Sequence, residues 1–253
     1  MPEIHSALST WDETSVTVRG RDLTTEIMGE LDFGATFLLL VTGELPDAGE
    51  ARLANAMLDS LMVHGMTAHA AAARLTYRSD PSLQGAVASG LLGVGSNFVG
   101  SMTECAEVLQ AVNAAESPPA AVQETVDTYR DAGDPFPGIG HRFHDPVDPR
   151  AERVLEIAAD AGVSGPHVDH LRAIQDGFED RLDFDLPINI TGAIAAACSD
   201  MGLSPSAARG FAIVSRAGGL VAEVLEEEDT PVAGEIVAAI EEHYQYTGPS
   251  ASQ

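Results

Sequence analysis

Apolar residues recur every three or four positions along most of this chain, the spacing that places them on one face of an α-helix. Residues 48–64 are a clear example, with apolar side chains at Ala51, Leu53, Ala54, Met57, Leu58, Leu61 and Met62. Alternation of apolar and polar residues, which is typical of a half-buried strand, is confined to residues 14–20. The pattern therefore predicts an all-α protein of roughly ten or more helices.

Glycine and proline residues mark where several of these helices begin and end. The apolar run 32–42 is followed by Gly43 and Pro46, as expected for a helix with a C-terminal glycine cap. Prolines open four others, because the missing N–H costs no hydrogen bond there. Residues 82–92 are small and apolar throughout, which predicts a buried helix packed closely on its neighbours. The remaining helices are expected at residues 102–115, 120–132, 149–161, 166–182, 188–201, 205–227 and 231–244.

Turn-forming segments suggest how the helices are grouped. Pro118-Pro119 and the loop 133–138 are the most linker-like stretches of the chain. Both lie within residues 111–186, which we expect to form a small helical domain. Residues 1–110 and 187–253 would together form the large helical domain on which it is hinged.

The composition of the chain limits the class of protein and the cell compartment to be expected. With 253 residues, 45% of them hydrophobic, it can bury a substantial core. No apolar run is long enough to span a membrane, and the first residues lack the features of a signal peptide. Cys105 and Cys198 make neither a disulfide framework nor a zinc site, so we expect a cytoplasmic protein with reduced thiols.

The charge of the chain is unusual. Its formal net charge is −26, and all 13 of its basic residues are arginine. A carboxylate-rich surface without lysine stays hydrated. At high salt the repulsion between its carboxylates is screened, so the folded protein tolerates such a surface. We interpret this as the composition of a halophile's protein, the alternative being an acidic mesophilic protein. In either case nucleic acid is not an expected partner, because no basic surface is available for its phosphates.

The chemistry is concentrated in residues 138–151. Gly138 and Gly140 allow the backbone to approach a ligand closely, and His141 can donate a hydrogen bond or exchange a proton near neutral pH. Further on, Asp148-Pro149 is a typical helix start, which places Arg150 at a helix N-terminus that favours anions. An imidazole beside a guanidinium indicates a site for a small carboxylate that carries a carbonyl or hydroxyl group.

This run resembles the Gly-x-Gly-His-Arg…Asp-Pro-Arg signature of the citrate synthase superfamily. Residues 89–100 and 186–192 further resemble segments of the citryl-CoA lyase module of ATP-citrate lyases and of stand-alone citryl-CoA lyases. Four more segments fit the superfamily in order and spacing: 18–23, 37–46, 64–68 and 211–219, followed by the C-terminal 246–249. The resemblance implies an all-α homodimer whose two lobes close on the substrate, with no metal.

The resemblance also assigns roles to individual residues. It implies that His141 polarises the substrate oxygen, that Arg150 and Arg216 bind carboxylates, and that His64 and Arg142 contact the substrate. We expect the side chains of 141, 150 and 216 to converge on one small anion. For either arginine the alternative is an intramolecular salt bridge. The coenzyme A thioester would be held along Pro137, Gly138, Ile139 and Gly140.

Several positions depart from the superfamily pattern. Thr191 stands where the family has its catalytic aspartate, and a threonine hydroxyl does not ionise near neutral pH. Asp183 or Asp185 could substitute for it. Phe98-Val99-Gly100 replaces a segment with a second catalytic histidine. Asp145 and Glu241-Glu242-His243 take the place of basic residues, a loss for which Arg142, His144 or bound salt cations could compensate.

Three functions remain open at this stage. The first is an enzyme that makes or breaks a carbon–carbon bond in an acyl-CoA, either a lyase that cleaves citryl-CoA to acetyl-CoA and oxaloacetate or a citrate synthase-like transferase. The second is a catalytically degenerate subunit that binds ligand or regulates, and that could pair with a homologue in a hetero-oligomer. The third is a purely structural helical protein. His167 and His170 with Asp169 could form a metal pair, but we favour a solvated helix face.

Overall fold

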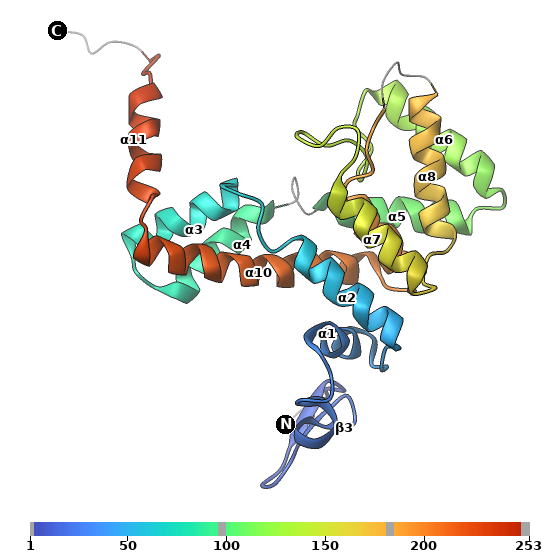
Figure 1. Ribbon diagram of the computed structural model, residues 1–253, viewed down its shortest axis with the longest axis horizontal. Helices are drawn as coiled ribbons and strands as arrows, with labels where there is room; N and C mark the ends of the chain where they lie inside the picture. Colours follow the sequence, from blue (N-terminus) through green and yellow to red (C-terminus); the bar gives the residue numbers. More distant parts are fainter. Residues whose placement is uncertain (1–2, 96–99, 181–184, 249–253) are drawn as a thin grey trace. The chain divides into compact units, whose positions relative to one another are not determined.

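The computed structural model describes residues 3–95, 100–180 and 185–248 (Figure 1). Their contacts group the chain into two compact units. Unit 1 comprises Met1–Leu61 and Ser96–Ser215, and unit 2 comprises Met62–Gly95 and Arg216–Gln253. These units do not follow the expected domains 1–110 with 187–253 and 111–186, so that division stays a prediction. Helices dominate both units, which confirms the all-α prediction.

Unit 1 begins with a small antiparallel sheet in the order β1 (Ser9–Trp11), β2 (Val16–Val18), β3 (Arg21–Asp22). Val18 pairs with Arg21, which leaves only Arg19 and Gly20 in the turn between β2 and β3. Both turn residues have positive φ angles, +49° and +79°, as a two-residue hairpin turn requires. A π-helical turn, η1 (Leu23–Ile27), follows directly. The sequence pattern predicted only the middle strand.

Helix caps explain the boundaries of the next two helices. The Asp32 side chain accepts from the backbone N–H of Ala35 at the start of α1 (Phe33–Thr42), and Gly43 ends that helix at φ +85°. Asp47 and Glu50 form a reciprocal capping box at the start of α2 (Ala48–Ser60). The helix predicted to reach residue 64 therefore ends four residues earlier.

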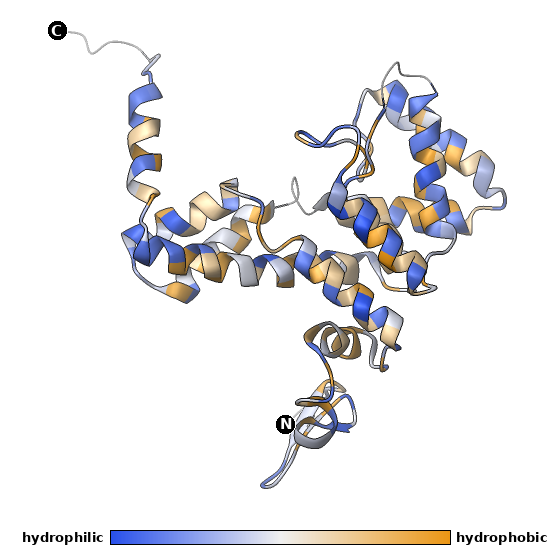
Figure 2. Cartoon of the chain, viewed as in Figure 1, coloured by the Kyte–Doolittle hydropathy of each residue, from blue (hydrophilic) through white to orange (hydrophobic). Residues whose placement is uncertain are grey.

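The rest of unit 1 is a helical core built around α9 (Ile190–Asp200). Nine of the eleven α9 residues are buried, because they are small or apolar on every side. Around α9 pack α5 (Ser101–Ala114), α7 (Pro149–Asp160) and α8 (Pro166–Glu179), and α6 (Pro118–Ala132) packs on α8. Apolar and polar residues occupy different faces of α7 and α8 (Figure 2).

Unit 2 consists of α3 (Ala68–Ser79), α4 (Leu83–Val94), the part of α10 (Pro205–Asp229) from Arg216 onward, and α11 (Ala233–His243). Gly90 allows close packing, since a Cβ there would lie 2.7 Å from a methyl group of Leu220. The prediction of close packing for residues 82–92 is confirmed, since α3 packs on α4 and Leu220 and Val224 of α10 join its apolar cluster. The prediction that this helix is buried was wrong, because only three of the twelve α4 residues are buried and Leu92 is 84% exposed.

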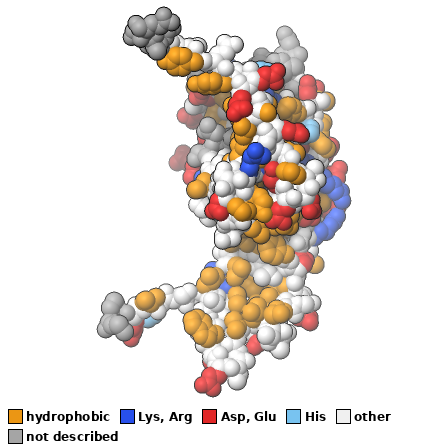
Figure 3. Space-filling model, turned by 90° about the vertical axis from the view of Figure 1, so that its left-hand side faces the viewer, with side chains coloured by type: hydrophobic (Ala, Val, Ile, Leu, Met, Phe, Trp, Pro, Cys, Tyr) orange, Lys and Arg blue, Asp and Glu red, His pale blue; other side chains and the backbone are white. Residues whose placement is uncertain are grey.

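The surface reflects the acidic composition. Carboxylate side chains are spread over the face drawn in Figure 3, whereas arginines occur at few positions on it. Within the described part of the chain, no helix combines the length and the apolar composition that crossing a bilayer requires.

Candidate active site

The loop that precedes His141 is interlocked with the start of α9. The Gly140 N–H donates to the Pro187 carbonyl (2.7 Å), the Asn189 N–H donates to the Gly138 carbonyl (3.0 Å), and the Asn189 side-chain amide donates to the Gly140 carbonyl (2.8 Å). Gly138 has φ +105°, and a Cβ there would lie 2.7 Å from the Cα of Gly192. Glycine is therefore required on both sides of this contact.

The same interlock fixes the first turn of α9. The Asn189 side-chain oxygen accepts from the backbone N–H of Thr191 (3.0 Å) and of Gly192 (3.2 Å), which caps the helix. Thr191 is half-buried in this turn. The turn in which the superfamily has its aspartate is thus held against the loop that carries His141.

Asp148 joins the N-terminus of α7 to that of α9. Its carboxylate is buried and accepts from the backbone N–H of Arg150 (3.1 Å), from Arg150 Nε (3.0 Å) and Nη2 (2.9 Å), and from the backbone N–H of Ile190 (3.1 Å). Burial alone raises the pKa of Asp148, but the hydrogen bonds and charge of Arg150 outweigh it, so the pKa lies below its usual value. Asp148 is therefore a fixed anion.

The hydrogen bonds of His141 determine which of its nitrogens carries the proton. Its Nδ1 accepts from the backbone N–H groups of Phe143 and His144, both at 3.0 Å. In the neutral ring the proton then resides on Nε2. Nε2 lies 3.2 Å from Nη2 of Arg150. Because both groups are donors, a single oxygen can accept from the two at once, which is the geometry of an anion or oxyanion site.

A second imidazole lies beside the first. The ring of His144 is half-buried, and its centroid lies 4.3 Å from that of His141 at an interplanar angle of 31°. One ligand atom each from His141, His144 and Asp148 lie within 4.8 Å of one another, so these three residues could in principle hold a metal ion. Both oxygens of Asp148 bind Arg150, however, and a cation would have to displace that guanidinium.

Two further predicted residues, His64 and Arg216, belong to unit 2. Arg216 Nη1 donates to the Met62 carbonyl (3.2 Å), and His64 is exposed in the segment after α2. Burial lowers the pKa of His69 to about 4, with the charges of Arg216 and His64 adding to the effect. The side chains of His64, His69 and Arg216 therefore share one electrostatic neighbourhood. His69 was not among the predicted site residues.

The coenzyme A contacts expected along 137–140 stay a prediction. Pro137, Gly138 and Ile139 are buried, and the polar groups of Gly138 and Gly140 named above bond to 187–189. Arg142 is exposed and lies over the Phe143 ring at 5.2 Å.

Asp183 and Asp185 were the two aspartates expected as possible replacements for the missing base. Asp185 is exposed, and Asp183 lies outside the described residues. Phe98 and Val99, from the segment that replaces the second catalytic histidine, also lie outside them. The salt bridge considered as an alternative for Arg150 is present, with Asp148 as its partner.

The prediction that His167 lies on a solvated helix face was wrong. His167 is buried, and its Nδ1 lies 2.8 Å from Asp200, whose carboxylate also accepts from the backbone N–H of Gly165, His167 and Val168. This carboxylate caps α8, and no sequence pattern showed that Asp200 would reach it. His170 contacts Asn113 instead (3.3 Å), so the two histidines do not form a pair.

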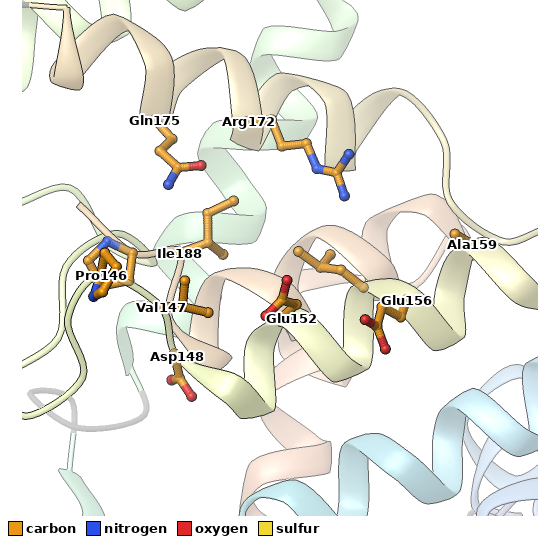
Figure 4. Close-up of a pocket in the computed structure, with 11 residues that line it drawn as sticks. Pro146, Val147, Asp148, Glu152, Glu156, Ala159, Arg172, Gln175 and Ile188 are labelled. Carbon is orange, nitrogen blue, oxygen red and sulfur yellow. The ribbon is translucent and has the colours of Figure 1, made fainter. Parts of the chain in front are cut away.

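A cavity of about 360 Å³ lies between α7 and α8 (Figure 4). Arg172 and Gln175 project into it from α8, opposite Glu152 and Glu156 of α7. Asp148 lies at its edge, but none of the residues predicted for the site lines it. The cavity and the His141 site are therefore neighbours that share one carboxylate.

Comparison with known proteins assigns the family. The model of the citrate synthase C-terminal domain matches residues 5–236. The chain therefore belongs to the citrate synthase family.

Solved structures agree with this assignment. The structure of citryl-CoA lyase from Hydrogenobacter thermophilus matches with a TM-score of 0.89 and 31% identity, over 99% of this chain and 96% of that chain. ATP citrate lyase from Methanothrix soehngenii, solved with citrate and coenzyme A, matches with a TM-score of 0.82 over 99% of this chain and 42% of that chain. At 18% identity this second likeness concerns the fold alone.

Among curated proteins, the chain is 29% identical over 171 residues to ATP-citrate synthase subunit 1 of Sordaria macrospora. The match covers 61% of this chain and 25% of that protein, so the chain spans about a quarter of the relative's length.

Proposed function

We propose that this protein is a lyase of the citryl-CoA lyase type, which cleaves citryl-CoA to acetyl-CoA and oxaloacetate. The observation that carries the proposal is the donor pair of His141 Nε2 and Arg150 Nη2, which lie 3.2 Å apart. The buried Asp148 holds Arg150, and the backbone N–H groups of Phe143 and His144 hold the His141 ring. The likeness to the Hydrogenobacter thermophilus enzyme over nearly the whole of both chains supports it. Citrate synthesis, a transferase reaction, would use the same groups in the opposite direction.

The donor pair suits the bond that must break. As the carbon–carbon bond of citryl-CoA breaks, the hydroxyl oxygen on the central carbon becomes the carbonyl oxygen of oxaloacetate. Charge on that oxygen changes during the step, and donors already in place stabilise it without reorganising. His141 is assigned to this oxygen. Arg150, which keeps its positive charge, is assigned to a neighbouring carboxylate.

The remaining assignments complete this proposal. His64, Arg142 and Arg216 are proposed as further substrate contacts, and the backbone of 137–140 as the binding segment for the coenzyme A thioester. A homodimer is proposed from the resemblance, with assembly beside a homologue as the alternative. The lysine-free, acidic composition supports a halophile's cytoplasm as the setting. No metal is part of the proposed chemistry.

A second function, that of a binding or regulatory subunit, is favoured by one observation. Thr191 cannot serve as a base without an activating group, so this chain lacks the family's acid at that position. Such a subunit would bind acetyl-CoA or oxaloacetate without turnover.

One experiment separates the two functions. The purified protein is incubated in multimolar KCl with citryl-CoA, and oxaloacetate is followed by a coupled reduction. In parallel, acetyl-CoA and oxaloacetate are supplied and free thiol is followed. Turnover that His141→Ala abolishes and Arg153→Ala retains supports the lyase, because Arg153 is an exposed α7 residue paired with Glu156. Ligand binding by calorimetry without turnover would support the regulatory subunit.

A further inference from the structure

The cavity between α7 and α8 has no part in the proposed cleavage, because none of the residues assigned to the substrate lines it. We propose that this cavity binds a small aliphatic α-amino acid, with its carboxylate on Arg172 and its ammonium group on Glu152 and Glu156. The inference concerns a second site, and it holds whether or not the chain cleaves citryl-CoA.

The cavity is large enough for an organic molecule and offers an apolar surface. Its volume is about 360 Å³, against about 30 Å³ for a water molecule in the liquid, and lies at the lower end of the roughly 300–1,000 Å³ of ligand pockets. Among its lining residues, Leu155 and Pro187 are buried and Ile188 is half-buried. An aliphatic side chain that covers these residues is removed from water, which favours binding.

Charges of opposite sign face each other across this cavity (Figure 4). Arg172 extends from α8, and Glu152 and Glu156 extend from α7 on the opposite side. Glu156 is paired with Arg153 at 2.8 Å. Within the part of the chain that the structure describes, the side chains of Arg172 and Glu152 take part in no hydrogen bond or ion pair. With 39 acidic residues and 13 arginines in the chain, an arginine without a carboxylate partner is a candidate for binding an anionic group of a ligand.

This arrangement favours a zwitterion over an ion of one sign. A carboxylate without an ammonium group would bind Arg172 but face the repulsion of Glu152 and Glu156, and an amine without a carboxylate would face the repulsion of Arg172. A molecule that carries both groups can form charge-assisted hydrogen bonds to both walls. Its aliphatic part then lies on the apolar lining, so an amino acid such as leucine matches both features of the cavity.

Calorimetry on the full chain in multimolar KCl tests the site with leucine as the probe and with no coenzyme A compound present. Leucine is expected to bind with a Kd of about 1 mM or tighter. Isocaproate, which is leucine without its ammonium group, and isoamylamine, which is leucine without its carboxylate, should each bind at least tenfold more weakly. Binding of either analogue as tight as that of leucine would overturn the inference, since a single charge would then explain the site. The absence of leucine binding would overturn it as well.

Three substitutions test whether leucine binds in this cavity. Arg172→Gln and Glu152→Gln should each weaken leucine binding at least tenfold, because each removes one charged partner at an exposed position. Ala159→Phe, at an exposed lining residue, should abolish binding by filling the space. Arg130→Gln is the matched control, since it removes an exposed arginine of unit 1 outside the cavity and should leave Kd within twofold. Wild-type affinity in either charge variant would place leucine elsewhere and overturn the inference.

Discussion

At the scale of single residues, Asp148 decides how the site is arranged. One buried carboxylate binds the Arg150 guanidinium in a two-point contact and also accepts from Ile190 at the start of α9. Arginine suits this contact because its planar fork matches a carboxylate. Asp148 therefore positions the guanidinium beside His141 without needing to touch the substrate.

Asp148→Asn is expected to lower kcat/KM for citryl-CoA about 10- to 100-fold. The amide keeps one acceptor oxygen but places an NH₂ group against the guanidinium, so Arg150 loses its fixed direction. Unfolding free energy should fall by about 2 kcal/mol, since a buried charged hydrogen bond is broken. Urea unfolding and steady-state kinetics measure the two effects. Asp131→Asn, at an exposed ion pair, should change stability by less than about 0.5 kcal/mol.

His69 predicts a pH dependence of stability for unit 2. Its pKa falls from 6.5 to about 4 in the folded protein, mainly through burial. A depressed histidine pKa means that the unfolded chain binds the proton more tightly. Stability is then full above pH 6.5 and is lost between about pH 6.5 and pH 4, by about 3 kcal/mol in total. His69→Gln should remove this part of the acid sensitivity in urea titrations at fixed KCl. An unchanged pH slope in the variant would contradict the assignment.

How much of the site the sequence predicted differs from residue to residue. The pairing of His141 with Arg150 could be predicted, because a glycine-rich loop and an Asp-Pro-Arg helix start lie within one short segment. The role of Asp148 could not, since its bond to Ile190 joins positions 42 residues apart. Asp200 reaches α8 across a similar separation. Such contacts are set by tertiary packing and leave no local pattern.

At the scale of elements, caps and prolines predicted most helix positions but not α3. Thr67 caps that helix, yet the run that follows is mostly alanine and carries no stripe of large apolar residues. Composition also misled for α4, which is small and apolar like α9. Tertiary packing buries nine of the eleven α9 residues but only three of the twelve α4 residues.

The contact between the 138–140 loop and α9 predicts what the replacement of Gly138 does to stability. Gly138→Ala is expected to lower the unfolding free energy by more than about 2 kcal/mol, because its Cβ would meet Gly192 and the Cys105 sulfur at a φ of +105°. The loop would move away from α9, so citryl-CoA cleavage should fall as well. Gly133→Ala is the matched control: its φ is +73° and no atom lies within 4 Å of its Cβ. Gly133→Ala should lower the unfolding free energy by only about 1 kcal/mol, as measured by urea unfolding. Equal losses in the two variants would refute the close contact.

At the scale of the whole molecule, charge is expected to govern stability. A net charge of −26 on 253 residues produces self-repulsion that grows as salt is removed. The Debye length shortens from about 10 Å in 0.1 M salt to about 3 Å in 1 M salt, so KCl screens most surface pairs. The same screening leaves buried pairs such as Asp148 with Arg150 largely intact.

We therefore expect the melting temperature to rise by more than about 10 °C between 0.1 M and 2 M KCl at pH 7.5, a shift that corresponds to a few kcal/mol for a chain of this size. Near the isoelectric point of about 4.3 the carboxylates are partly protonated, and the dependence should become much weaker. Glu241→Arg with Glu242→Arg lowers the net negative charge by four at exposed positions of α11, and should flatten the KCl dependence at pH 7.5. Scanning calorimetry across a KCl series measures all three. A salt effect that is equally large near the isoelectric point would point to specific ion binding instead of screening.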